Sequence, residues 1–235
     1  MHPITIQNII LHPIALPFVE VLYTSFGGEE FKSAIIAELH TSDGAIGWGE
    51  IVADVRPGYG SETMTTSYHI AQEFLLPLLM NQTITHPSDV LRLFKPVRGH
   101  HHTKAGIEGA VWDAFAKSNH MRLADLFSAS LPDGHISREV AVVGVSIGIK
   151  PTIQDTLAVI QKRYDEGYRR IKLKIKRGWD VELARGVRDA MPDITLMLDA
   201  NSDYTLADAD HLAQLDAFNL LMIEQPLADD DILEH

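Results

Sequence analysis

The feature that most constrains the fold is a regular alternation of strand-like and helix-like segments in the second half of the chain. The strand-like runs are residues 141–149, 170–175, 195–198 and 219–223. Capping signals mark the helices between them: Gly167 stands where a helix would end, Asp180 where the next would begin, and Thr205 is followed three residues later by Asp208. Strands that alternate with helices in this way are typical of βαβ units, so the pattern predicts a parallel sheet.

A charged residue ends three successive strands of this sheet. Lys174, Asp199 and Glu224 are each separated from the next by 25 residues. One βα unit per step is the rhythm of a (β/α)₈ barrel, in which active-site groups lie at the C-terminal ends of the strands. An open, doubly wound sheet is the alternative, but it usually begins with a glycine-rich turn, and the sequence has no G-x-G-x-x-G motif.

The barrel interpretation accounts for only part of the expected strands. Four βα units are visible in 235 residues, whereas a barrel has eight. We therefore expect about the first half of a barrel, with the remaining strands encoded beyond residue 235.

The first half of the chain has a different composition of elements. Its strand-like runs are residues 4–14, 19–25, 33–40 and 45–50, and residues 41–44 form a turn signal. Helical periodicity follows over residues 61–78, with Pro77 as a kink or end, and over residues 103–118. We expect an α+β domain over residues 1–138 and the first half of a barrel over residues 139–235.

Composition limits the function. The chain carries 20 basic and 32 acidic residues, a formal charge of −12, which argues against nucleic acid as a partner. It contains no cysteine, which excludes thiolate metal sites and a cysteine nucleophile. The N-terminus does not resemble a signal peptide and no apolar run is long enough to span a membrane. We expect a cytoplasmic protein that acts on a small molecule.

Three lysines alternate with apolar residues in one strand. Lys172, Lys174 and Lys176 would share one face, with Leu173 and Ile175 on the other. Inside a barrel, crowding and burial would lower a lysine pKa and allow the amine to accept a proton. An edge strand with a solvated basic face is the alternative explanation.

Two acids follow the next two strands. Carboxylates such as Asp199 and Glu224 at the ends of neighbouring strands suit Mg²⁺, and Asn201 shares the face of Asp199. Taken singly, each acid could instead be an ordinary loop or helix-initiating residue. Together with Lys174, they fit the removal of a proton α to a carboxylate, a chemistry that combines a base with bound magnesium.

At this point the residues resemble a known family. Residues 170–180, with their Lys-x-Lys pattern, resemble the corresponding strand of the muconate-lactonizing subgroup of the enolase superfamily. Residues 198–201 and 223–227 resemble its first two metal-ligand strands, and residues 47–50 and 104–113 its capping domain. Residues 144–148 resemble the first barrel strand of one branch, the N-succinylamino acid racemases and o-succinylbenzoate synthases.

The resemblance implies a role for each candidate residue. Lys174 would be an acid/base catalyst, and Lys172 would lower its pKa and help to hold the substrate carboxylate. Asp199 and Glu224 would bind Mg²⁺, with Mn²⁺ as a possible substitute. The substrate pocket would be lined by Ser146, Asn201, Tyr23 and Phe26, and the loops 23–30 and 53–60 would close over it.

The implied reaction is Mg²⁺-dependent proton abstraction through an enediolate. The reaction would serve the dehydration step of menaquinone biosynthesis, the racemisation of N-acylamino acids, or both. The full-length form would be a homo-oligomer. Another enzyme of the subgroup, such as a dipeptide epimerase or cycloisomerase, remains open. The third metal ligand and the opposing lysine would lie beyond residue 235, so we expect this chain alone to be weak or inactive. It could also act only as a folding or interaction unit, or as a barrel with another chemistry.

Overall fold

The chain folds into two compact units. The computed structural model describes residues 1–24, 27–58, 60–131, 136 and 138–235, with the backbone alone at 20, 22 and 24. The first unit consists of Met1–Pro17 and Phe31–Val140. The second consists of Phe18–Glu30 and Ala141–His235.

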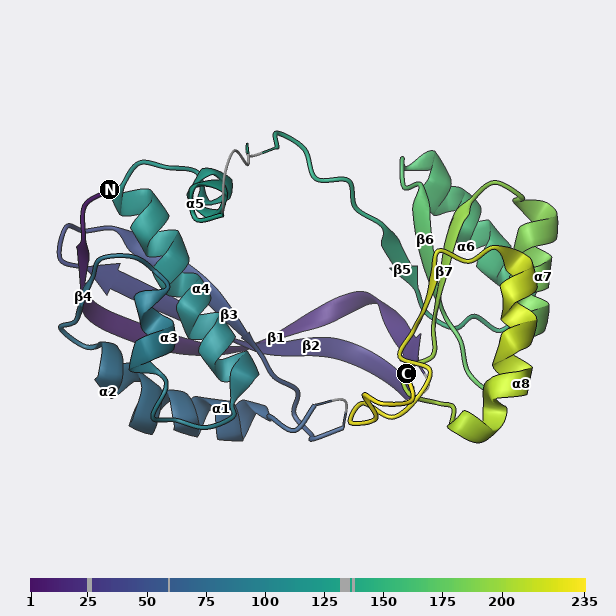
Figure 1. The fold of residues 1–235 in the computed structure, drawn as a ribbon, viewed down its shortest axis with the longest axis horizontal. Helices are drawn as coiled ribbons and strands as arrows, with labels where there is room; N and C mark the ends of the chain where they lie inside the picture. The colour runs from purple at the N-terminus through teal and green to yellow at the C-terminus, as the bar shows by residue number, and fades with distance from the viewer. Residues whose placement is uncertain (25–26, 59, 132–135, 137) are drawn as a thin grey trace. The chain divides into compact units, whose positions relative to one another are not determined.

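The first unit is a sheet covered by helices (Figure 1). Its sheet has the order β3-β2-β1-β4 and consists of β3 (Ile46–Val52), β4 (Thr83–Ile84) and the parts of β1 (Ile4–Thr24) and β2 (Gly27–Thr41) that lie outside Phe18–Glu30. Its helical segments are α1 (Met64–Ile70), the π-helix η1 (Ala71–Leu75), α2 (Leu76–Leu79), α3 (Asp89–Leu93), α4 (His101–Ser118) and α5 (Leu123–Ala129). The α+β class expected for this half is confirmed.

The longest strand differs from the sequence prediction. Two separate strands were expected over residues 4–14 and 19–25, but β1 is continuous from Ile4 to Thr24, and residue 25 lies outside the described residues. Strand β4 pairs with β1 only at Ile4 and Thr5. Most of β1 is therefore an edge strand, where proline is tolerated, and Pro13 and Pro17 do not interrupt it.

Helix α4 lies very close to strand β3. Gly49 has no side chain to separate them, and a β-carbon there would overlap the carbonyl oxygen of Gly106. The backbone nitrogen of Trp48 donates to the carboxylate of Asp113 at 2.8 Å, which fixes the helix along the strand. Small residues at this contact thus explain the glycine pattern that the sequence shows in residues 47–50 and 104–109.

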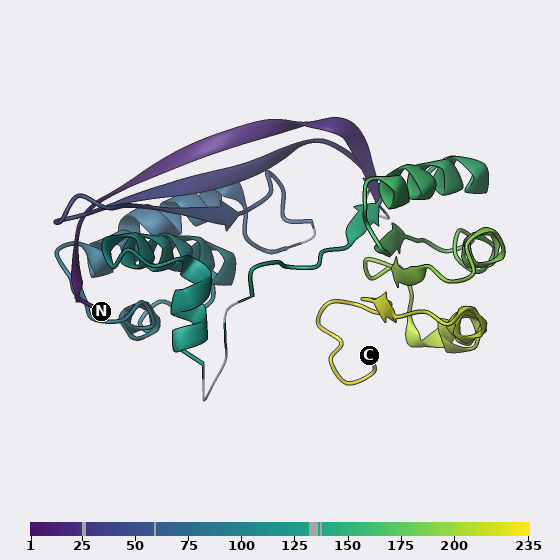
Figure 2. The same cartoon turned by 90° about the horizontal axis from the view of Figure 1, so that it is seen from above.

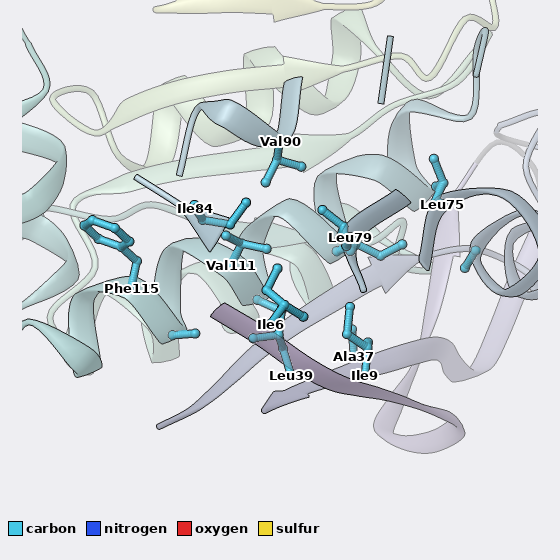
Figure 3. Close-up of a cluster of buried hydrophobic side chains, with 14 of the residues drawn as sticks. Ile6, Ile9, Ala37, Leu39, Leu75, Leu79, Ile84, Val90, Val111 and Phe115 are labelled. Atoms are coloured by element: carbon cyan, nitrogen blue, oxygen red, sulfur yellow. The ribbon is translucent and has the colours of Figure 1, made fainter. Parts of the chain in front are cut away.

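The core of the first unit lies between the sheet and the helices, as Figure 3 shows. Side chains from β1, β2, η1, α2, β4, α3 and α4 meet there, and the largest of them are inaccessible to solvent. The labelled members are Ile6, Ile9, Ala37, Leu39, Leu75, Leu79, Ile84, Val90, Val111 and Phe115. Burial of this apolar surface is the main force that stabilises the unit.

The second unit contains the predicted parallel sheet. Its strands are β5 (Val145–Ile147), β6 (Arg170–Lys174), β7 (Thr195–Asp199) and β8 (Met222–Glu224), in that order, and all three pairings are parallel. The connecting helical segments are α6 (Ile153–Asp165), α7 (Val181–Ala190), η2 (Leu206–Asp208), α8 (Ala209–Leu212) and η3 (Ala213–Phe218). Figure 2 shows the helices α6, α7 and α8 on one side of the strands.

Local signals place these elements as the sequence predicts. Gly167 adopts φ +107° after α6, the carboxylate of Asp180 caps α7, and Thr205 forms a capping box with Asp208. The sheet and its helices are the first part of a (β/α)₈ barrel, as expected. Within the residues that the structure describes, no helix has the length and apolar character needed to cross a membrane.

Candidate active site

The candidate site lies at the C-terminal ends of three neighbouring strands. Strand pairing places Lys174 of β6 directly opposite Asp199 of β7, and Asp199 opposite Glu224 of β8. The equal spacing of these residues in the sequence therefore becomes adjacency across the sheet. Lys172, two residues before Lys174, points to the same face.

Four side chains form one charged cluster. The ammonium of Lys174 lies 2.7 Å from Oδ2 of Asp199, and that of Lys172 lies 3.1 Å from the same oxygen. Lys172 also contacts both oxygens of Glu224, at 2.9 and 3.1 Å. The structure thus brings together both predicted lysines and both predicted metal ligands.

Asp199 is the centre of the cluster and is fully buried. Its Oδ2 accepts from the two lysines, and its Oδ1 accepts from the backbone nitrogen of Asn201 at 3.1 Å. Burial favours a higher pKa for this carboxyl, but the hydrogen bonds from Lys174 and Lys172 hold the pKa of Asp199 below its ordinary value. Asp199 is therefore a carboxylate at neutral pH.

The electrostatics of Lys172 differ from the sequence expectation. Burial alone favours a lower pKa, but hydrogen bonds to Glu224 and Asp199 raise the pKa of Lys172 above its ordinary value. Crowding among lysines was expected to have the opposite effect. The expectation was wrong for Lys172 because two carboxylates lie closer to it than the sequence pattern could indicate.

Lys176 does not join this cluster. Strand β6 ends at Lys174, and the backbone of Lys176 pairs with that of Trp179 in a tight turn that includes Gly178 at φ +73°. The side chain of Lys176 is exposed. The three lysines therefore do not form the continuous row that their alternation predicted.

The remaining predicted residues stand at different places. Asn201 is buried and joined to Asp199 through its backbone, and the exposed Ser146 lies opposite Lys172 in the pairing of β5 with β6. Tyr23 is half-exposed, and its carbonyl accepts from the backbone nitrogen of Ile149 at 3.0 Å. Phe26 lies outside the described residues.

The structure also contains a polar cluster that the sequence did not reveal. The carboxylate of Asp180 is buried and accepts from the hydroxyl of Tyr204 at 2.7 Å, and it contacts Nε2 of His211 at 2.9 Å. Arg177 reaches from the same loop to Asp208, with two contacts of 2.6 Å. The sequence identified Asp180 only as a helix cap. No local signal indicates that Tyr204 and His211 also contact its carboxylate. These contacts join the loops that follow β6 and β7, directly beyond Lys174 and Asp199.

The donor set fits a divalent cation in part. Asp199 and Glu224 supply hard carboxylate oxygens, the type of ligand that Mg²⁺ prefers, and both point at a single cationic group, the ammonium of Lys172. In the described part of the chain no group of three or more histidine or acidic side chains is placed to hold a metal. The two acids would therefore form part of a coordination shell.

Comparison with known protein families covers both units. Residues 9–128 match the family described as mandelate racemase/muconate lactonizing enzyme, N-terminal domain. Residues 155–235 match the enolase C-terminal domain-like family.

Similar curated proteins have names from one branch of this group. An o-succinylbenzoate synthase of Geobacillus kaustophilus is 47% identical over 232 residues, which are 99% of this chain and 60% of that protein. An N-succinylamino acid racemase of Thermus thermophilus is 38% identical over 225 residues, 96% of this chain and 59% of that protein. The chain thus spans about 60% of the length of these relatives.

A solved structure supports the same relationship. A member of the enolase superfamily from Listeria innocua superposes with a TM-score of 0.91 at 36% identity, over 99% of this chain and 61% of that one. The sequence resemblance is therefore confirmed by family, relatives and fold. The chain belongs to the mandelate racemase/muconate lactonizing enzyme family of the enolase superfamily.

Proposed function

We propose that this chain carries the proton-abstracting part of an enzyme that acts on a small carboxylate, either as an o-succinylbenzoate synthase, as an N-succinylamino acid racemase, or as both. The observation that supports it best is the cluster at the strand ends, where Lys174 contacts Asp199 at 2.7 Å. An amine and two carboxylates on adjacent strands are the groups that such a reaction needs. The chain spans about 60% of its relatives, so the proposal concerns the steps that these residues perform.

In this proposal Lys174 is the acid/base catalyst. Its side chain is 12% exposed and is therefore largely shielded from water. The amine would take the proton from the carbon next to the substrate carboxylate and hold it at Nζ. Lys172 would hold the substrate carboxylate, because its ammonium lies on the same face two residues away.

Asp199 and Glu224 would hold the magnesium ion in this proposal. Bound Mg²⁺, or Mn²⁺ in its place, supplies positive charge that stabilises the negative charge developing on the substrate carboxylate. The hydrogen bond from the backbone of Asn201 would keep the buried carboxylate of Asp199 oriented.

We propose that Ser146, Asn201, Tyr23 and Phe26 contact the substrate, with the loops 23–30 and 53–60 closing over it. Residues 1–138 would then act as the capping domain and residues 139–235 as the first half of the catalytic barrel. A homo-oligomer in the cytoplasm is the form we propose for the whole protein. Other activities of the subgroup have less support, because the relatives named above are synthases and racemases.

Exchange of the substrate α-proton in D₂O tests the proposal. The chain would be continued beyond residue 235 by the matching part of the Geobacillus kaustophilus relative and supplied with Mg²⁺ and an N-succinylamino acid. We expect Lys174→Ala to lower the exchange rate by about 10²–10⁴-fold, since it removes the base. Lys176→Ala, which changes an exposed lysine near the same strand, should leave the rate unchanged. Equal exchange in the Lys174→Ala chain would contradict the proposal.

A further inference from the structure

Lys172 occupies a distinctive place in the charged cluster. Its ammonium bridges β7 and β8, because it contacts Oδ2 of Asp199 at 3.1 Å and both oxygens of Glu224 at 2.9 and 3.1 Å. Lys174, in contrast, is paired with Asp199. Among the described residues, Lys172 is the cation that salt-bridges both proposed metal ligands.

The bridge balances charges that would otherwise repel. Asp199 is fully buried and the side chain of Glu224 is 29% exposed, so water screens their mutual repulsion poorly. Two ammonium groups and two carboxylates leave the cluster neutral. Removal of Lys172 would leave this arrangement with an excess negative charge.

The bridge also uses the oxygens that a metal ion would need. Mg²⁺ binds carboxylate oxygens at about 2.0–2.1 Å, much closer than an ammonium group. Both Glu224 oxygens and Oδ2 of Asp199 already accept hydrogen bonds from Lys172 or Lys174. A divalent cation shared by the two acids therefore competes with the ammonium of Lys172.

We propose that Lys172 is an internal counter-cation that a divalent metal ion displaces. In protein stripped of divalent cations it holds Asp199 and Glu224 together. When the metal binds, the flexible side chain of Lys172 leaves Glu224 and its ammonium becomes available to a substrate carboxylate. Metal binding and carboxylate binding are then positively coupled. This inference rests on the proposed function in taking Asp199 and Glu224 as the metal ligands and Lys172 as the group that meets a substrate carboxylate.

The first test measures metal affinity by calorimetry, with Mg²⁺ titrated into the chain continued beyond residue 235 as described above, so that the coordination shell is complete. Lys172→Met removes the competing cation, so we expect the Kd for Mg²⁺ to fall roughly fivefold or more. Lys172→Arg keeps a cation that bridges the acids and should not show this tightening. Lys176→Met removes an exposed lysine of the same segment and controls for the general loss of positive charge.

The second test uses the unaltered chain, because Lys172→Met could unfold. Acetylation of lysine side chains is followed by mass spectrometry after EDTA treatment and again with saturating Mg²⁺. We expect Mg²⁺ to increase the labelling rate of Lys172 several-fold, since its amine leaves the two carboxylates, and to leave the rate of the exposed Lys176 unchanged.

The outcomes separate the inference from the proposed function. If Mg²⁺ binds the unaltered chain and Lys172→Met equally, or if labelling of Lys172 does not increase, the displacement is wrong while the metal site stands. If Asp199→Asn leaves the Mg²⁺ affinity of the continued chain unchanged, or if the unaltered continued chain binds no Mg²⁺, the proposed metal site and the inference both fail.

Discussion

Single residues decide how closely helix α4 can approach strand β3. A β-carbon at Gly106 would lie 2.6 Å from the carbonyl oxygen of Glu50 and 2.5 Å from a side-chain carbon of Ile51. At Gly109, three residues along the same helix, the nearest atom would be 3.9 Å away. Replacement of glycine by alanine should therefore destabilise the fold at position 106 and stabilise it at position 109.

We expect Gly106→Ala to lower the free energy of unfolding by about 1–3 kcal/mol, because the helix must move away from the strand. We expect Gly109→Ala to raise it by about 0.5–1 kcal/mol, because alanine restricts the unfolded chain and clashes with nothing. Urea unfolding followed by circular dichroism measures both changes. If the two variants change the free energy of unfolding by similar amounts, helix α4 can move away from strand β3 without loss of stability.

The charge balance around Asp199 leads to a second prediction at this scale. Asp199→Asn keeps the shape of the side chain but leaves Lys172 and Lys174 with the single carboxylate of Glu224. We expect the free energy of unfolding to fall by about 3 kcal/mol, as for other broken buried ion pairs. Asp193→Asn, at an exposed position before the same strand, is the control. A loss equal to that of the control would mean that the cluster contributes nothing to stability.

The residues of the cluster were predictable from sequence, but their contacts were not. Alternation within β6 predicts that Lys172 and Lys174 share a face, and the repeat predicts that Asp199 and Glu224 follow at neighbouring strand ends. Which acid each lysine meets depends on the twist and spacing of strands, about which one sequence says little. The departure of Lys176 depends on a local turn.

At the scale of elements, the loops after β6 and β7 are joined by buried polar contacts. Burial favours a higher pKa for Asp180, but hydrogen bonds from Tyr204, His211 and the backbone of Val181 hold the pKa of Asp180 below its ordinary value. A lowered pKa in the folded state means that the carboxylate stabilises the fold above the unfolded pKa, about 3.9. This stabilisation disappears as the pH falls through the lower, folded value.

Tyr204→Phe tests this contact. It removes the hydroxyl donor and lets the pKa of Asp180 rise, so we expect the free energy of unfolding at pH 7 to fall by about 1–3 kcal/mol. The difference from the unaltered chain should shrink below about pH 4, where the unfolded state also binds the proton. Urea unfolding over a pH series measures this difference.

Tyr164→Phe, on the surface of α6, provides the matched control because it makes the same chemical change at a part-exposed side chain. We expect it to alter stability little at any pH. If Tyr204→Phe lowers the free energy of unfolding by the same amount at pH 7 and at acid pH, the hydroxyl of Tyr204 stabilises the fold independently of the ionisation of Asp180.

Element prediction succeeded where burial imposed a pattern. Strand β7 reads as a short apolar run and strand β6 as an alternation of apolar and charged residues, with helix caps between them, because helices cover one face of the sheet. It failed for β1, which was expected as two strands over residues 4–14 and 19–25 but continues through Pro13 and Pro17, as an edge strand allows. It also missed the short strand β4, whose two residues have no periodicity to detect.

At the scale of the whole molecule, each unit has its own hydrophobic core, and the sheet of the second unit ends at β8. Leu221 and Met222 at this edge are 56% and 43% exposed. A groove of about 450 Å³ runs beside them, lined by Ala209, Leu212, Ala213, Leu215, Asp216, Asn219, Leu220, Met222 and Ile223. An apolar edge of this kind favours self-association.

We expect Leu221→Lys to reduce the association of the 235-residue chain, because a charge at a sheet edge opposes pairing with another copy. Size-exclusion chromatography with light scattering at increasing concentration measures the effect. Leu206→Lys changes a leucine of nearly equal exposure in η2 and is the control. An equal reduction by both variants would attribute the effect to net charge and not to the edge.

The pairing of Lys174 with Asp199 also limits how the parallel sheet can assemble. Because successive side chains alternate faces, sliding β7 by one residue along β6 would place Leu198 or Ala200 opposite Lys174. The lysine and the aspartate would then be shielded from water without each other, which is costly. The charged residues of the proposed site therefore also favour one strand register during assembly, because a misaligned sheet would bury a lysine and an aspartate without partners.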